Sequence, residues 1–110
     1  MTDIRTTLKI YTEAFATHDP SRLGDILAED VVVERAQGGA AEGRAAALEL
    51  WTAIANDTGG TFEIEEELVD GEIAVLAWTF RFEGGFTRGA NLLKIRDGRV
   101  YHAVGYTKAN

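Results

Sequence analysis

Apolar residues recur at helical spacing in two parts of the chain. In residues 3–17, Ile4, Leu8, Tyr11 and Phe15 follow at intervals of four, three and four, which places them on one face of a helix. Residues 44–56 are rich in alanine, show the same spacing and end before a glycine pair. Between them, Asp19-Pro20 is typical of a helix start, which predicts a short helix from Pro20 to about Ala28. The pattern thus predicts three helices.

The second half of the chain changes to an alternation of apolar and polar residues. It predicts strands over residues 62–68, 73–83, 86–96 and 99–107, separated by the glycine-containing turns at 70–71, 84–85 and 97–98. A β-branched triplet at 31–33 predicts one earlier, brief strand that ends near Arg35. We therefore expect a single α+β domain over residues 1–110, in which the last four strands form an antiparallel meander.

Composition and charge narrow the classes of function. Eleven Lys and Arg against eighteen Asp and Glu give a formal net charge of −7, which opposes binding to nucleic acid or to an anionic membrane. The chain has no cysteine and two histidines, so a Cys-ligated or three-histidine metal centre is excluded, and we expect no metal and no cofactor. The N-terminal residues lack the apolar run of a signal peptide, and no window is apolar enough to span a membrane, which predicts a cytoplasmic protein.

Several short segments carry a resemblance to a known superfamily. They are the helix segment 11–15, the Asp19-Pro20 start, the run 27–31, the Glu42-Gly43 helix entry and the final turn at 97–100. Together with the element order, they resemble the SnoaL-like branch of the nuclear-transport-factor-two-like (NTF2-like) proteins, whose relatives include ketosteroid isomerases and polyketide cyclases. The resemblance implies a cone-shaped barrel, in which a strongly curved, mostly antiparallel sheet wraps around three N-terminal helices. It also implies a ligand pocket at the open end of the cone.

The comparison with ketosteroid isomerases assigns roles to three positions. Those enzymes use a tyrosine on the first helix and a protonated aspartic acid on a late strand as oxyanion donors, with an aspartate after the first strand as base. The resemblance places Tyr11 at the tyrosine, Asn91 near the oxyanion acid and Arg35 at the base. An amide can still donate a hydrogen bond, but an arginine stays protonated and cannot remove a proton. The usual isomerase mechanism is therefore not expected.

Other residues complete the candidate site. His102 shares strand parity with Val100 and is the candidate for moving a proton near neutral pH, although a structural histidine is the alternative. Arg35 is a candidate for binding an anion, or else a surface residue paired to Glu34 or Glu42. The remaining candidates for lining a pocket are aromatic residues, which could equally be core: Trp51, Trp78, Phe80 and Tyr106.

Three functions stay open at this point. The first is a pocket that binds a small apolar carbonyl compound and catalyses cofactor-independent proton transfer of the isomerase or cyclase type, with Tyr11 and Asn91 polarising an oxygen and His102 moving the proton. The second is a non-catalytic module for hydrophobic-ligand binding or dimerisation. The third, an epoxide hydrolase, would need Asp70 or Asp97 turned into the cavity. We also expect a homodimer that buries the face carrying Leu92 and Tyr101.

Overall fold

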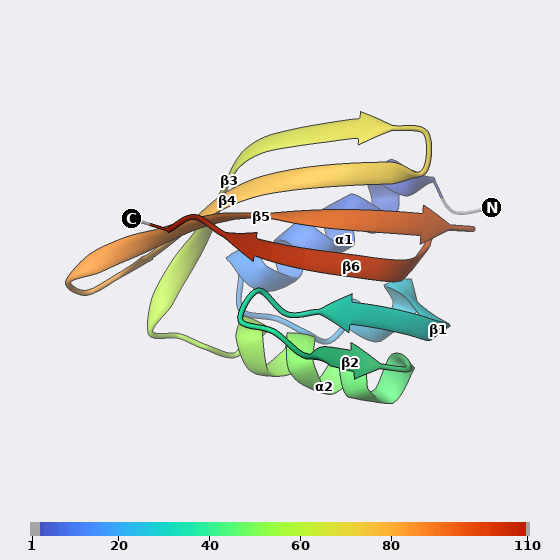
Figure 1. Ribbon diagram of the computed structural model, residues 1–110, viewed down its shortest axis with the longest axis horizontal. Helices are drawn as coiled ribbons and strands as arrows, with labels where there is room; N and C mark the ends of the chain where they lie inside the picture. Colours follow the sequence, from blue (N-terminus) through green and yellow to red (C-terminus); the bar gives the residue numbers. More distant parts are fainter. Residues whose placement is uncertain (1–2, 110) are drawn as a thin grey trace.

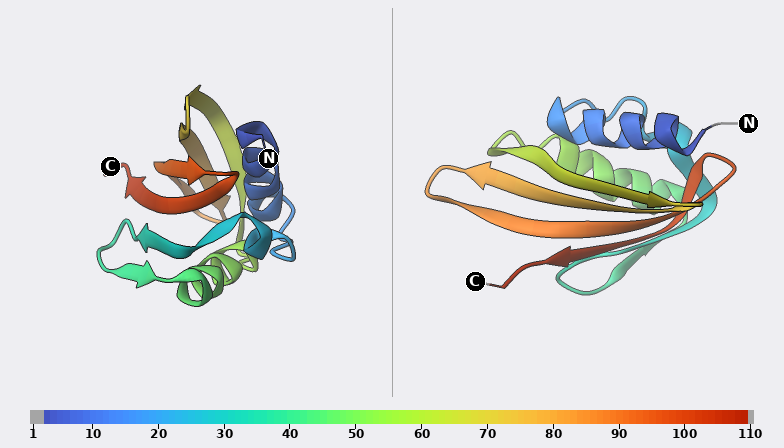
Figure 2. Two further views of the ribbon diagram at one scale, coloured as in Figure 1. Left: turned by 90° about the vertical axis from the view of Figure 1, so that its right-hand side faces the viewer. Right: turned by 90° about the horizontal axis from the view of Figure 1, so that it is seen from above.

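Two α-helices lie on one side of a curved six-stranded sheet (Figures 1 and 2). The structure, a computed structural model, describes residues 3–109. The helical elements are α1 (Ile4–Ala16), the 3-10 helix η1 (Leu23–Ile26) and α2 (Arg44–Ala55). The strands are β1 (Leu27–Glu34), β2 (Ala40–Glu42), β3 (Gly60–Asp70), β4 (Ile73–Phe82), β5 (Gly85–Arg96) and β6 (Arg99–Thr107).

Helix α1 buries the face that its sequence predicts. Asp3 caps the helix, since its Oδ1 accepts a hydrogen bond from the backbone N of Arg5 at 3.2 Å. The apolar face packs into the core, and the buried hydroxyl of Thr7 donates to the carbonyl oxygen of Gly98 at 2.7 Å. This bond ties the first helix to the turn between β5 and β6. Both long predicted helices are confirmed.

The predicted second helix forms only in part. Asp19 does accept the backbone N–H of Ser21 at 3.0 Å, as a helix start would require. The chain then forms only the four-residue η1, which contains Gly24, a poor helix former. Leu27 already belongs to β1 and pairs with Val100 of β6. Leu27 and Ala28, which local spacing assigned to the end of a helix, therefore belong to a strand of the sheet.

The sheet has the order β2-β1-β6-β5-β4-β3. The predicted meander from β3 to β6 is confirmed, with antiparallel pairing throughout. The sequence pattern missed two features: β1 is parallel to β6, and the short β2 pairs with β1. The sheet curves around the helices as expected but stays open, with β2 and β3 as its edges, so the cone-shaped barrel around three helices is not confirmed (Figure 2).

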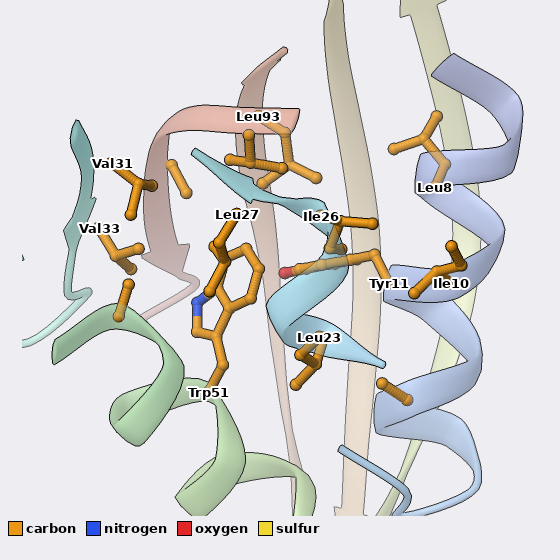
Figure 3. Packing of buried hydrophobic residues seen from close by; sticks show 14 of the residues in the cluster. Leu8, Ile10, Tyr11, Leu23, Ile26, Leu27, Val31, Val33, Trp51 and Leu93 are labelled. Carbon is orange, nitrogen blue, oxygen red and sulfur yellow. The ribbon is translucent and has the colours of Figure 1, made fainter. Parts of the chain in front are cut away.

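The core lies between the helices and the concave face of the sheet. Figure 3 shows Tyr11 reaching from α1 toward Trp51 of α2, with Leu23 and Ile26 of η1 close by. The rings of Tyr11 and Trp51 are 5.0 Å apart between centroids in an edge-to-face arrangement. Leu76 and Leu93 close the core from β4 and β5, and both are fully buried. Beside Tyr11 and Trp51, the packing opens into a cavity.

Candidate functional site

A cavity of about 310 Å³ lies between the two helices and the inner face of the sheet. This volume lies at the lower end of the range of about 300–1,000 Å³ that is usual for small-molecule sites. Its wall is mainly apolar and includes Phe15 of α1, Ile54 of α2 and Ile64 of β3. Within residues 3–109, no group of three or more His, Asp or Glu side chains is placed to hold a metal ion.

The polar centre of the cavity is a pair formed by Tyr11 and Asn91. Nδ2 of Asn91 donates to the hydroxyl oxygen of Tyr11 at 2.6 Å, and both side chains line the cavity. Tyr11 is only 4% exposed, and its burial raises the pKa of the phenol to about 12, against the opposing effect of the Asn91 hydrogen bond. The phenol therefore stays neutral at physiological pH. Because its oxygen is used as the acceptor, its proton remains available for another group.

Aromatic rings form much of the cavity wall. Trp51 and Trp78, both predicted, line it, and so does Phe62, which the sequence pattern did not single out. Phe62 contacts Trp78 edge to face at a centroid distance of 5.4 Å. Nε1 of Trp78 is buried and has no hydrogen-bond partner among the described residues. Such rings favour a flat, apolar ligand.

Arg35 lies at the rim of the cavity, in the turn that follows β1. Its side chain is exposed, and within residues 3–109 it forms neither of the ion pairs considered for it, with Glu34 or with Glu42. The neighbouring Ala36 and Gln37 also line the rim. The structure thus brings Tyr11, Asn91, Arg35, Trp51 and Trp78 around one space.

Three predicted site residues do not line this cavity. Phe80 packs against Phe62 at 4.6 Å and continues the aromatic row outward to Phe82, while Tyr106 is 56% exposed. His102 was expected to share the parity of Val100, and that placement is wrong. The pairing of β5 with β6 shifts between Lys94 and Ile95, and the buried residues of β6 are Val100 and Ala103. This bulge turns His102 to the opposite face.

His102 is instead bound to a residue at the cavity rim. Its Nε2 lies 2.6 Å from Oε2 of Glu34, the last residue of β1. Glu34 itself belongs to the cavity lining, together with Ala36 and Gly105. Sequence reasoning missed Ala36 and Gly105, because no local signal marks them. Only the pairing of β6 with β1 and β5 places them beside Asn91.

The two aspartates that an epoxide hydrolase would need lie elsewhere. Asp70 ends β3 and Asp97 stands in the turn between β5 and β6, and both are exposed. Neither is among the residues that line the cavity. The cavity, as the structure describes it from residue 3 to 109, therefore lacks the aspartates of an epoxide hydrolase.

Comparison with known proteins places the chain in a family. Residues 8–103 match the family model of the SnoaL-like domain. An NTF2-like protein of unknown function from Mesorhizobium loti has 34% sequence identity and a TM-score of 0.92, and the match covers 96% of this chain and 91% of that one. A comparison with curated proteins finds no match.

Two further solved structures carry names that suggest activities of their own. A provisionally named polyketide cyclase from Sinorhizobium meliloti has 27% identity and a TM-score of 0.75, with 91% of this chain and 93% of that one covered. A provisionally named ketosteroid isomerase from Kribbella flavida has 21% identity and a TM-score of 0.82, with coverages of 97% and 78%. In the part of the chain that the structure describes, no helix is long and apolar enough to cross a membrane. From the match over residues 8–103, the chain belongs to the SnoaL-like domain family.

Proposed function

We propose that this protein binds a small, apolar carbonyl compound in the cavity and polarises its carbonyl oxygen. The observation that carries the proposal is the bond from Nδ2 of Asn91 to the hydroxyl oxygen of Tyr11. A hydroxyl has one proton to donate, and this bond leaves that proton free. A carbonyl oxygen entering the cavity is the complementary acceptor.

The surroundings of Tyr11 strengthen such a bond. The phenol is buried among aromatic rings, where a hydrogen bond acts through a low dielectric and competes little with water. Asn91 holds the phenol in place before the ligand arrives, so little reorganisation is needed on binding. At the rim, Arg35 supplies a positive charge for an anionic group on the ligand.

Proton transfer next to the bound carbonyl is a second candidate function. It is favoured by the pair of Tyr11 and Asn91, which can hold the oxygen of an enolate as well as that of a carbonyl. A base from the solvent would take a proton from the carbon beside the carbonyl, and the C–H electron pair would form an enolate whose oxygen accepts from Tyr11. Returning the proton to the same or a conjugated carbon completes the reaction without a cofactor. Glu34 and His102 do not supply the base, because their side chains meet on the face of the sheet opposite the cavity.

Assembly is proposed from the face of the sheet that points away from the helices. Val75, Leu92 and Val104 are cross-strand neighbours on β4, β5 and β6, and they share the face opposite the buried Leu76 and Leu93. This apolar row includes Leu92, which the sequence assigned to a homodimer contact. A second copy of the chain is the proposed partner.

Binding is tested with acetophenone and ethylbenzene, which differ at the carbonyl group. We expect acetophenone to bind more tightly than ethylbenzene. The variant Tyr11→Phe should lower the ratio of the two affinities by about three- to tenfold. Titration calorimetry gives the dissociation constants. Tyr106→Phe is the matched control, because Tyr106 is exposed and does not line the cavity. Equal affinity for the two compounds in the wild-type protein would contradict the proposal.

Proton transfer is tested separately, by exchange of the acetophenone methyl protons in heavy water. If the protein is a catalyst, it accelerates exchange, and Tyr11→Phe lowers the acceleration at saturating acetophenone. Tyr106→Phe is again the control, because Tyr106 is exposed and does not line the cavity. Binding without acceleration by the wild-type protein assigns ligand binding alone.

A further inference from the structure

The cavity has a second polar spot, created by a residue without a side chain. Gly105 of β6 lies opposite Asn91 in the pairing with β5, and both line the cavity. The three heavy atoms nearest to the position that a Cβ would take are all polar. They are Oδ1 of Asn91 at 3.3 Å, the backbone N of Ala36 at 3.7 Å and the carbonyl oxygen of Glu34 at 3.8 Å. We call the space in front of these atoms, at contact distance from the Cα of Gly105, the Gly105 niche.

The niche offers both kinds of hydrogen-bonding partner. Oδ1 of Asn91 and the carbonyl of Glu34 are acceptors. Ala36 follows the end of β1, and its N–H, a donor, makes no hydrogen bond with any other residue from 3 to 109. A hydroxyl group, which donates one hydrogen bond and accepts others, satisfies this combination. An ether or an alkyl group of similar size leaves at least one partner unmatched.

Asn91 connects the niche with the hydroxyl of Tyr11, where the ligand carbonyl is proposed to bind. Its Nδ2 donates to Tyr11, while its Oδ1 faces the niche, so the two ends of one amide serve two places in the cavity. Resting on the proposed function, we propose that the bound carbonyl compound also carries a hydroxyl group, and that this hydroxyl occupies the Gly105 niche. The ligand class is then a hydroxylated aromatic or alicyclic ketone. Gly105 is the residue that determines this specificity.

Filling the niche is compatible with the fold. The backbone of Gly105 is outside the left-handed region, so an alanine is not strained there, and its Cβ would meet the three polar atoms at 3.3 Å or more. Gly105→Ala therefore narrows the space at the cost of a small shift of Oδ1 of Asn91. Gly24→Ala is the matched control, because its Cβ would meet its nearest neighbour, Nη2 of Arg44, at the same 3.3 Å, away from the cavity lining.

The test compares acetophenone with hydroxylated derivatives that reach different parts of the cavity. These are meta-hydroxyacetophenone, para-hydroxyacetophenone and phenacyl alcohol, each paired with its methoxy analogue. We expect at least one hydroxyl compound to bind the wild-type protein about three- to tenfold more tightly than acetophenone and its methoxy analogue. Gly105→Ala should bring the ratio of the two affinities, hydroxyl compound over acetophenone, close to one, and Gly24→Ala should leave this ratio unchanged.

Nuclear magnetic resonance of the wild-type protein gives a second readout that needs no variant. The backbone amide of Ala36 should shift with the preferred hydroxyl compound and not with acetophenone. The inference is overturned if acetophenone binds in a Tyr11-dependent way but no hydroxyl compound gains affinity, or if the gain survives Gly105→Ala. If acetophenone binds no better than ethylbenzene, the proposed function fails first, and the inference fails with it.

Discussion

Single residues decide the chemistry of the cavity through their hydrogen bonds. Asn91 donates through an amide, which needs no raised pKa and donates at any pH. Tyr11 keeps its proton because it is buried, with the pKa raised to about 12. The pair is therefore a neutral donor whose state does not change across the physiological range. No sequence pattern alone specifies that the two side chains meet, since they are separated by 80 residues.

The buried phenol makes stability depend on pH in the alkaline range. The pKa of Tyr11 rises from 10.0 in the unfolded chain to about 12 in the folded one, so its contribution is intact below about pH 10 and is lost as the pH rises through about 12. The loss is about 3 kcal/mol at most. We expect the free energy of unfolding of the wild-type protein to fall toward that of Tyr11→Phe over this window, measured by urea denaturation. Parallel curves for the two proteins would contradict the burial of an un-ionised phenol.

At the scale of elements, glycines let aromatic side chains lie against the sheet. Gly89 of β5 is the direct partner of Trp78 on β4. A Cβ at Gly89 would come within 2.4 Å of the carbonyl oxygen of Tyr106 and 2.5 Å of Cζ2 of Trp78. The absence of a side chain at Gly89 therefore fixes the position of one wall of the cavity.

We expect Gly89→Ala to destabilise the protein by about 1–3 kcal/mol, because the backbone contact cannot be relieved by a change of rotamer. Urea denaturation measures the effect. Gly105→Ala on the neighbouring β6 is the control, since its Cβ meets nothing closer than 3.3 Å. A loss of stability that is no larger for Gly89→Ala than for Gly105→Ala would mean that Trp78 packs differently.

At the scale of the whole molecule, the open sheet has two different faces. The concave face packs against both helices (Figure 2). The cavity lies between this face and the helices. The other face carries the row of Val75, Leu92 and Val104, which are partly exposed in the single chain. Tyr101 lies at the bulge of β6, where its ring covers the guanidinium of Arg96 at 4.8 Å. We therefore expect the outer face to pair with a second copy.

Light scattering tests this assembly. We expect the wild-type protein to have twice the 12.0 kDa mass of the chain, and Leu92→Asp to shift it to the single mass, because a charge in the apolar row is costly to bury. Thr61→Asp, on the exposed edge strand β3, should leave the mass unchanged. A wild-type protein of 12.0 kDa at high micromolar concentration rules out the dimer.

The sequence by itself determined α1, α2 and the meander of β3 to β6, because helical spacing, strand alternation and glycine turns are local signals. It also singled out Tyr11, Asn91, Arg35, Trp51 and Trp78, which share one cavity. Only the tertiary structure decided that residues 27–30 join a strand, that β1 runs parallel to β6, and that a bulge turns His102 away from the cavity toward Glu34. Strand pairing over long separations places these features, and one extra residue in a strand reverses every side chain beyond it.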